Sequence, residues 1–142
     1  MSNIMAAIGI AQFDRLEEFS NSRKKIAKIY DKLFKSHSRI QVLERDYDAI
    51  VPHIYVIKIK GLKKRDLLRK KLLEKGIETG IHYLPNHYLE KYSLKEGENL
   101  PNTEKIYSQI LTLPIHPEIK EKDINFIVDN LNLLLNSSYL KI

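Results

Sequence analysis

The sequence predicts an α+β fold, in which helices pack on a small antiparallel or mixed sheet of about three strands. Apolar residues recur at helical spacing near both ends of the chain, and a run of alternating residues lies between them. The chain has 142 residues. Because about 150 residues is typical of one hydrophobic core, we expect a single domain over residues 1–142, with a long helix over residues 4–36 and an α+β body over residues 50–136.

The N-terminal segment favours one long helix, straight or bent, because residues 4–36 contain no proline and only Gly9 as a helix breaker. Its first part, up to Phe13, is apolar or small on nearly every side, which is typical of a helix surrounded by protein. Its second part carries a single apolar stripe, formed by Ile26, Ile29, Tyr30 and Leu33. We therefore expect the first part to contact another chain or another domain.

The clearest strand lies within residues 50–60. There Tyr55, Ile57 and Ile59 point to one face while the alternating lysines point to the other, which is the pattern of a half-buried strand. Two further short strands are expected, over residues 77–81 and 111–113.

The remaining helices are bounded by recognisable end signals. A short basic helix over residues 65–75 ends at Gly76, whose position suits a left-handed C-cap. Asn102 is expected to cap a short helix that continues to about Gln109. The last helix, over residues 121–136, has acidic residues in its first turn. Its apolar stripe consists of Ile124, Ile127, Val128, Leu131 and Leu134.

The composition excludes several classes of protein. The absence of cysteine excludes a disulfide scaffold, a thiolate zinc site and a cysteine nucleophile. The apolar N-terminal run lacks the basic start of a signal peptide and reaches Asp14 and Arg15 too soon to cross a membrane. We therefore expect a soluble, cytoplasmic protein with no membrane partner.

The charge is basic, with 24 Lys+Arg against 18 Asp+Glu and a formal net charge of +6. The cations cluster over residues 58–75, as they would on a nucleic-acid surface. No aromatic ladder, helix-turn-helix spacing or RNP-type motif accompanies them. The composition therefore favours a solvated helix face, and no nucleic-acid partner is expected.

The long loop over residues 82–101, which includes a turn at Gly97, is the best candidate for a binding site. Its histidines, His82 and His87, stand five apart around Pro85 with no glutamate between them. Because a helical zinc site needs the i, i+4 spacing, no metal site is expected.

Hydrogen-bonding side chains are dense in this loop, which starts beside Gly80. The imidazole and phenol groups of His82, Tyr83 and His87 can serve as donors to hydroxyls or phosphates. His116 is flanked by prolines after a strand, and we expect it to be structural.

Three segments of the chain resemble one family in its order and spacing. Residues 1–12 are similar to the segment N-Y-R-M-S-N-I-x-A-A-I-G-x-A-Q of the DegT/DnrJ/StrS-type PLP-dependent sugar-nucleotide aminotransferases. Residues 80–87 are similar to the family's G-I-x-x-H-Y-x-P-x-H stretch. Residues 100–104 and 111–117 are similar to its L-P-x-T-E and L-x-L-P-x-H-P signatures.

The resemblance implies the C-terminal small domain of a fold type I aminotransferase. Such an enzyme transfers the amino group of an amino acid such as glutamate to a keto-sugar nucleotide. In the family, the PLP-binding lysine and the acid facing the pyridine nitrogen lie in an N-terminal domain that precedes the segment seen here. The resemblance therefore assigns no catalytic residue to this chain, implies PLP only in the complete enzyme, and implies that the chain alone is inactive.

The family's active sites lie at a dimer interface, so the resemblance also implies a homo-oligomer or assembly with the missing N-terminal PLP domain. It places His82, Tyr83 and His87 beside the nucleotide-sugar substrate, with Asn3 as a weaker candidate on the cofactor side. Two other hypotheses stay open. One is a free-standing sugar-nucleotide-binding or regulatory and assembly domain derived from the family, and the other is a basic nucleic-acid-binding domain.

Overall fold

The computed structural model describes residues 1–95 and 98–137. Two helices come first, α1 (Asn3–Phe13) and α2 (Leu16–Phe34), followed by strands β1 (Ile40–Val42) and β2 (Tyr55–Ile59) and helix α3 (Arg65–Leu73). Two single 3-10 turns follow, η1 (Asn86–Tyr88) and η2 (Glu90–Tyr92). The chain then forms helix α4 (Pro101–Gln109), strand β3 (Ile110–Leu113) and helix α5 (Glu121–Asn136). The expected turn at Gly97 lies outside the described residues.

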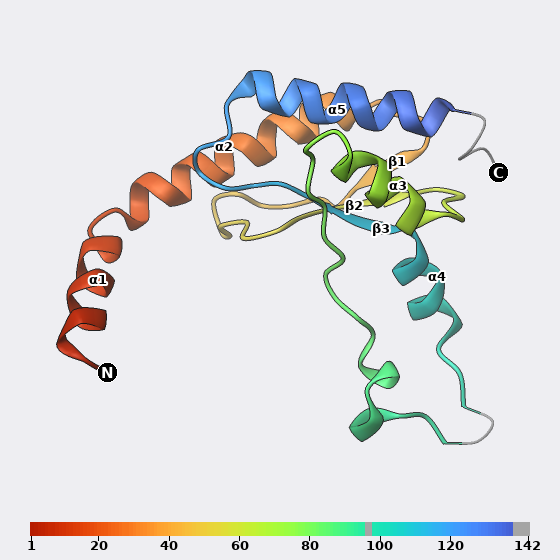
Figure 1. The fold of residues 1–142 in the computed structure, drawn as a ribbon, viewed down its shortest axis with the longest axis horizontal. Coiled ribbons are helices and arrows are strands. Elements are labelled where there is room, and N and C mark those ends of the chain that lie inside the picture. The colour runs from red at the N-terminus through yellow and green to blue at the C-terminus, as the bar shows by residue number, and fades with distance from the viewer. Residues whose placement is uncertain (96–97, 138–142) are drawn as a thin grey trace.

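The described strands form one antiparallel sheet in the order β1-β2-β3. In its register Tyr55 pairs with Leu113 and Ile57 pairs with Leu111. Helices α2 and α5 lie side by side over the sheet, with α3 beside α5 (Figure 1). The predicted α+β class with a small antiparallel sheet is therefore confirmed.

The core lies between the central strand and these helices. Tyr55, Ile57 and Ile59 are completely buried, as their alternation predicts. The ring of Tyr30 on α2 stacks on the ring of Tyr55, with centroids 4.7 Å apart, and on the ring of Phe34, with centroids 6.0 Å apart. Aromatic stacking thus joins α2 to the middle of the sheet.

The expectation of one helix over residues 4–36 is wrong in one respect, because the chain breaks at Asp14 and Arg15 into α1 and α2. Arg15 leaves helical geometry, with φ −101° and ψ 7°, and its N–H bonds to the Gln12 carbonyl, only three residues back, at 3.2 Å. Its guanidinium turns forward to Glu18, at 2.8 Å. Helix α1 therefore projects from the body, and none of its residues is buried.

The two predicted apolar stripes are each shifted by one residue at their ends. Leu33 is 40% exposed, whereas its neighbour Phe34 is buried. On α5 Leu135 is buried, whereas Leu134 is only partly covered. A step of four residues from Tyr30 and from Leu131 places Phe34 and Leu135 on the buried faces of the two helices.

The predicted set of strands needs two corrections, because one strand was not predicted and one predicted strand does not form. β1 lies in a polar stretch that carried no strand signal, and its three residues pair with β2 along an edge. Conversely, residues 77–81 form no strand, apart from one isolated bridge between Gly80 and Thr112. The physical reason is that the next hydrogen-bonded pair of this ladder would join Glu78 to Pro114, which has no N–H to donate and whose carbonyl accepts a hydrogen bond from the Tyr30 hydroxyl.

Helix ends follow the expected chemistry at one position and depart from it at another. Gly76 has φ +76°, and the N–H of buried Ile77 bonds to the Leu72 carbonyl at 2.9 Å, so the predicted left-handed cap is confirmed. Asn102 is not the cap of α4, because Pro101 already occupies the first turn and Leu100 is the N-cap. Proline suits this position because its fixed φ is helical and it has no N–H to leave unpaired.

A polar cluster lies where α2 meets the sheet. The hydroxyls of Tyr47 and Tyr55 donate to the Asp31 carboxylate at 2.5 and 2.6 Å. Arg45 lies 3.8 Å from the same carboxylate and donates to the Val56 carbonyl at 3.0 Å. Burial, and then the hydrogen bond and charge of Asp31, raise the pKa of Tyr47 to about 12.

We expect Leu131→Ala to lower the free energy of unfolding by about 2–5 kcal/mol, because Leu131 is completely buried and its removal leaves a cavity. Leu133 on the same helix is 63% exposed, so Leu133→Ala should cost less than about 0.5 kcal/mol. Urea denaturation followed by circular dichroism compares the two variants. Equal losses would contradict the described packing of α5.

The Tyr47 pKa predicts a loss of stability in alkali. An unfolded tyrosine ionises near pH 10, whereas folded Tyr47 ionises at about 12. The folded state therefore holds more protons in this window, so the contribution of Tyr47 is complete below pH 10 and is lost as the pH rises through 12. Denaturation midpoints of the wild type and Tyr47→Phe should converge across this window, and parallel curves would refute the assignment.

Candidate functional site

The isolated bridge between Gly80 and Thr112 holds the candidate loop against the sheet. The Gly80 N–H donates to the Thr112 carbonyl at 3.0 Å, and the Thr112 N–H donates to the Gly80 carbonyl at 2.9 Å. Beyond this bridge the chain leaves the sheet as an arm, which carries η1 and η2 and returns through α4 (Figure 1). The start of the arm is thus fixed by backbone pairing.

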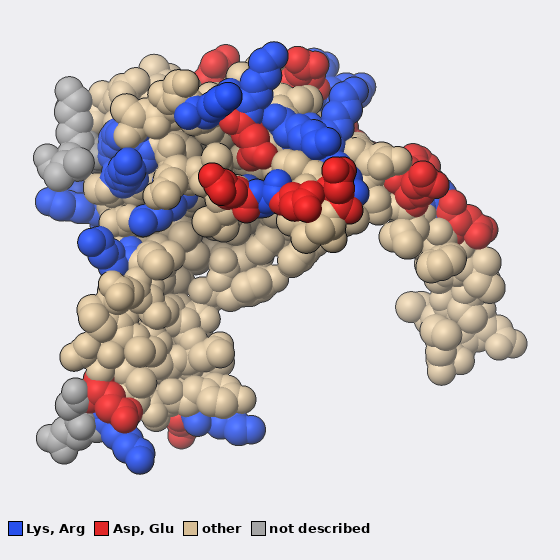
Figure 2. Space-filling view, turned by 180° about the vertical axis from the view of Figure 1, so that it is seen from behind, with Lys and Arg blue, Asp and Glu red and all other residues tan. Residues whose placement is uncertain are grey.

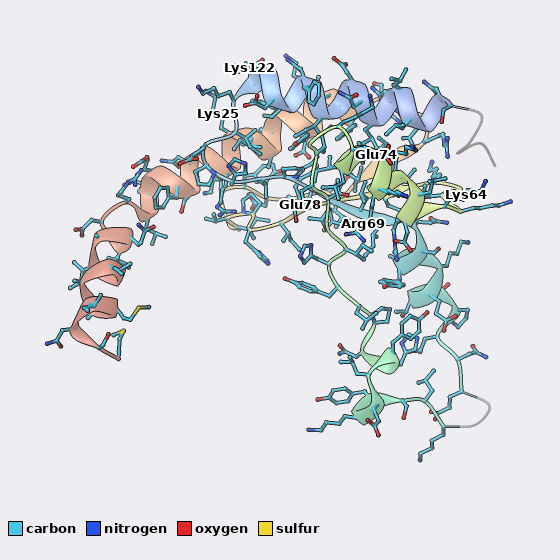
Figure 3. The ribbon with its side chains drawn as sticks, in the orientation of Figure 1. Lys25, Lys64, Arg69, Glu74, Glu78 and Lys122 are labelled. Atoms are coloured by element: carbon cyan, nitrogen blue, oxygen red, sulfur yellow. The ribbon has the colours of Figure 1, made fainter. Side chains whose placement is uncertain are left out.

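A hollow of about 410 Å³ lies at this point, between the end of β3, the segment before β2 and the start of the arm. Its hydrogen-bonding groups come from separate parts of the chain: Arg23, His53, Glu78, Thr79, His82, Thr112 and His116. Glu78 lies where the chain passes the sheet on its way to the arm (Figure 3). The imidazole and guanidinium groups suit oxygen acceptors of a ligand, and the Glu78 carboxylate suits hydroxyl donors.

One of the predicted substrate-binding residues, His82, lines this hollow, and its neighbour Tyr83 contacts two residues that line it, His82 and His53. The Nδ1 of His82 lies 3.0 Å from the Oγ1 of Thr112, and its ring contacts the Tyr83 ring edge-on at 4.9 Å between centroids. The Tyr83 hydroxyl lies 3.5 Å from the Nε2 of His53, and the Tyr83 side chain is exposed. His82 and Tyr83 therefore present polar groups side by side at one rim.

The other two predicted residues lie elsewhere. The Nε2 of His87 lies 3.3 Å from the Glu104 carboxylate on α4, so His87 joins η1 to α4 within the arm and does not reach the hollow. Asn3 starts α1, at the end of the chain far from the arm (Figure 1). The structure brings together His82 and Tyr83 and separates them from His87 and Asn3.

Helix α2 fixes the wall of the hollow opposite the arm. The Arg23 guanidinium donates to the carbonyls of Ile115 and His53, at 3.1 and 3.3 Å. The Ser22 hydroxyl donates to the Pro117 carbonyl at 2.8 Å. These bonds hold the segment before β2 and the segment after β3 against the same helix, because charge-assisted bonds to carbonyls are strong.

Sequence reasoning missed Arg23 and His53 and expected His116 to be structural. The side chain of His116 is exposed and lines the hollow. Arg23 stands among lysines on a helix, where no pattern distinguishes it from a solvated cation. Buried Thr112 did carry a signal, because it is a polar residue in the middle of a predicted strand just before the P-I-H-P segment.

The side chains that line the hollow decide whether it can hold a metal ion or PLP. No cluster of three or more His, Cys, Asp or Glu side chains among residues 1–95 and 98–137 is arranged to hold a metal ion. A PLP aldimine needs a lysine amine, and no described lysine lines the hollow. The residues present therefore do not fit PLP by themselves. Within the described part of the chain, no helix is long and apolar enough to cross a membrane.

Comparison with known proteins identifies a family and individual relatives that this chain resembles. The model of the DegT/DnrJ/EryC1/StrS aminotransferase family matches residues 1–132. The UDP-4-amino-4,6-dideoxy-N-acetyl-beta-L-altrosamine transaminase of Campylobacter jejuni is 30% identical over 139 residues, which cover 95% of this chain and 37% of that protein. A pleiotropic regulatory protein of Geobacillus stearothermophilus is 32% identical over 138 residues, which cover 92% of this chain and 36% of that protein.

Comparison of structures gives the same result as comparison of sequences. The PLP-form of the putative sugar aminotransferase Spr1654 from Streptococcus pneumoniae superposes with a TM-score of 0.80 at 29% identity, covering 94% of this chain and 36% of that chain. The chain thus spans little more than a third of the length of the relatives it matches. The match over residues 1–132 shows that the chain belongs to the DegT/DnrJ/EryC1/StrS aminotransferase family.

Proposed function

We propose that the chain supplies the C-terminal part of a PLP-dependent sugar-nucleotide aminotransferase, which moves an amino group from an amino acid such as glutamate to a keto-sugar nucleotide in the cytoplasm. The observation that carries the proposal is the position of His82 and Tyr83. The family's H-Y-x-P-x-H stretch starts at a polar hollow and is held there by the bridge between Gly80 and Thr112.

In this proposal the chain binds the substrate and does not carry out the transfer. PLP, held by the N-terminal part of the enzyme, supplies the electron sink for transamination. His82 and Tyr83 offer hydrogen bonds to oxygen atoms of the nucleotide sugar, and His87 stabilises the arm through Glu104. Asn3 stays a weaker candidate for the cofactor side.

Helix α1 is the surface that we propose contacts the rest of the enzyme or a second copy of the chain. Its apolar side chains are exposed, with Ile4 at 73%, Ile8 at 53% and Phe13 at 73%. It carries no charged residue from Asn3 to Phe13, and it forms an uncharged projection in Figure 2. A soluble protein rarely leaves such a surface in water, so a covering partner is expected.

One comparison favours a second candidate function. The Geobacillus stearothermophilus relative carries the name of a regulatory protein. A free-standing sugar-nucleotide-binding or regulatory domain would use the same hollow but would need no PLP segment. Reading the DNA upstream of Met1 separates the two candidates, because a segment encoding the PLP-lysine domain supports the aminotransferase.

The first test joins this chain to the N-terminal segment of the Campylobacter jejuni transaminase that precedes the matched part. The chimera should hold PLP and transfer the amino group of glutamate to a keto-sugar nucleotide. His82→Ala should lower kcat/KM about tenfold or more, because a hydrogen bond to substrate is lost. Lys122→Ala, on the exposed face of α5 (Figure 3), is the matched control and should keep full activity.

Two results would contradict the proposal. One is a folded, PLP-loaded chimera that transfers no amino group to any keto-sugar nucleotide tested. The other is a His82→Ala chimera whose kcat/KM equals that of the Lys122→Ala control.

The chain by itself should neither form an aldimine at one site nor transaminate. Treatment with PLP, reduction with borohydride and peptide mapping should give low labelling spread over many surface lysines, because free amines react weakly with any aldehyde. Stoichiometric labelling of one lysine would show that the chain carries a PLP site of its own.

A further inference from the structure

The ring of His82 is held on two sides by the bridge. Its Nδ1 lies 3.0 Å from the Oγ1 of Thr112, and Thr112 as a whole residue is only 6% exposed. A Cβ at Gly80 would come within 2.6 Å of the His82 Cε1 and 3.0 Å of its Nδ1. The imidazole therefore occupies the space that any side chain at Gly80 would need.

The hydrogen bond between His82 and Thr112 can run in two directions, and the surroundings favour one of them. Among the described residues, Nδ1 of His82 is the hydrogen-bond partner of the Thr112 hydroxyl, and that hydroxyl has no second acceptor. If Nδ1 donated, the hydroxyl proton would be left without an acceptor in a largely buried position, which costs free energy. If the hydroxyl donates to Nδ1, both groups are satisfied.

We propose that Thr112 is a positioning residue that holds His82 as the tautomer with its proton on Nε2. Nε2 has no partner among the described residues, and His82 lines the hollow, so its N–H is free for a ligand. His82 then donates a hydrogen bond to an acceptor oxygen of a hydroxyl or phosphate group and does not abstract a proton. The class of ligand rests on the proposed function, whereas the tautomer does not.

Gly80 has a matching role in this proposal. Its missing side chain makes room for the ring, and its backbone pairs with the residue that orients the ring. Gly80→Ala should therefore displace the imidazole and break its bond with Thr112, although the backbone at Gly80 does not require positive φ.

The test is long-range ¹H–¹⁵N NMR of the ¹⁵N-labelled chain at a pH where His82 is neutral, which reports the protonated ring nitrogen. Wild type and Thr112→Ser should show His82 protonated on Nε2. Thr112→Val should shift the Nδ1 resonance toward that of an imidazole exchanging between both tautomers. Thr79→Val is the matched control, because buried Thr79 also lines the hollow but its Oγ1 has no partner in the described structure, so its spectrum should equal that of the wild type.

Protonation of Nδ1 in the wild type would overturn the proposal, and this measurement needs no variant to fold. An unchanged His82 spectrum in folded Thr112→Val would overturn it as well. In the active chimera, Thr112→Val should raise KM for the nucleotide sugar about fivefold with little change in kcat, and Thr112→Ser should restore KM. If the tautomer is as proposed but His82→Ala leaves kcat/KM unchanged, the proposed function fails and the role of Thr112 in orienting the ring stands.

Discussion

The pairing of Thr112 with Gly80 is the contact through which the candidate site depends on the core. Successive side chains of a strand point to opposite faces, so Leu111 and Leu113 enter the core while Thr112 points away from them. Both leucines are buried, and their packing fixes the position of Thr112 in the sheet. The arm starts at Gly80, whose backbone is paired with that strand, so the position of His82 depends on the packing of the core.

Helix α2 also contacts both the core and the hollow. Tyr30 stacks on Tyr55 in the core, and its hydroxyl donates to the Pro114 carbonyl at 3.1 Å. Burial raises the pKa of that hydroxyl, so it stays a donor. About two turns toward the N-terminus of α2, Arg23 binds carbonyls on both walls of the hollow. A change that moves α2 should therefore disturb the hollow together with the core.

The sequence could predict elements with a periodic pattern of apolar residues, such as β2 and α5, because that period indicates both the type of element and its buried face. It could not predict β1, which is short and lies at an edge, nor the absence of a strand over residues 77–81, which depends on the pairing of this segment with Thr112 and Pro114. At the site, the family motif located His82 and Tyr83. It could not place His53 or Arg23, whose positions result from tertiary contacts between distant segments.

The most direct measurement is a crystal structure of the complete enzyme, or of the active chimera, with a nucleotide sugar bound. The Nε2 of His82 should lie about 2.7–3.2 Å from an oxygen of the nucleotide sugar, and Nδ1 should keep its bond to Thr112. A nucleotide sugar bound away from the hollow, with His82 still paired to Thr112 and its Nε2 facing solvent, would contradict the central claim that this chain supplies the substrate-binding wall.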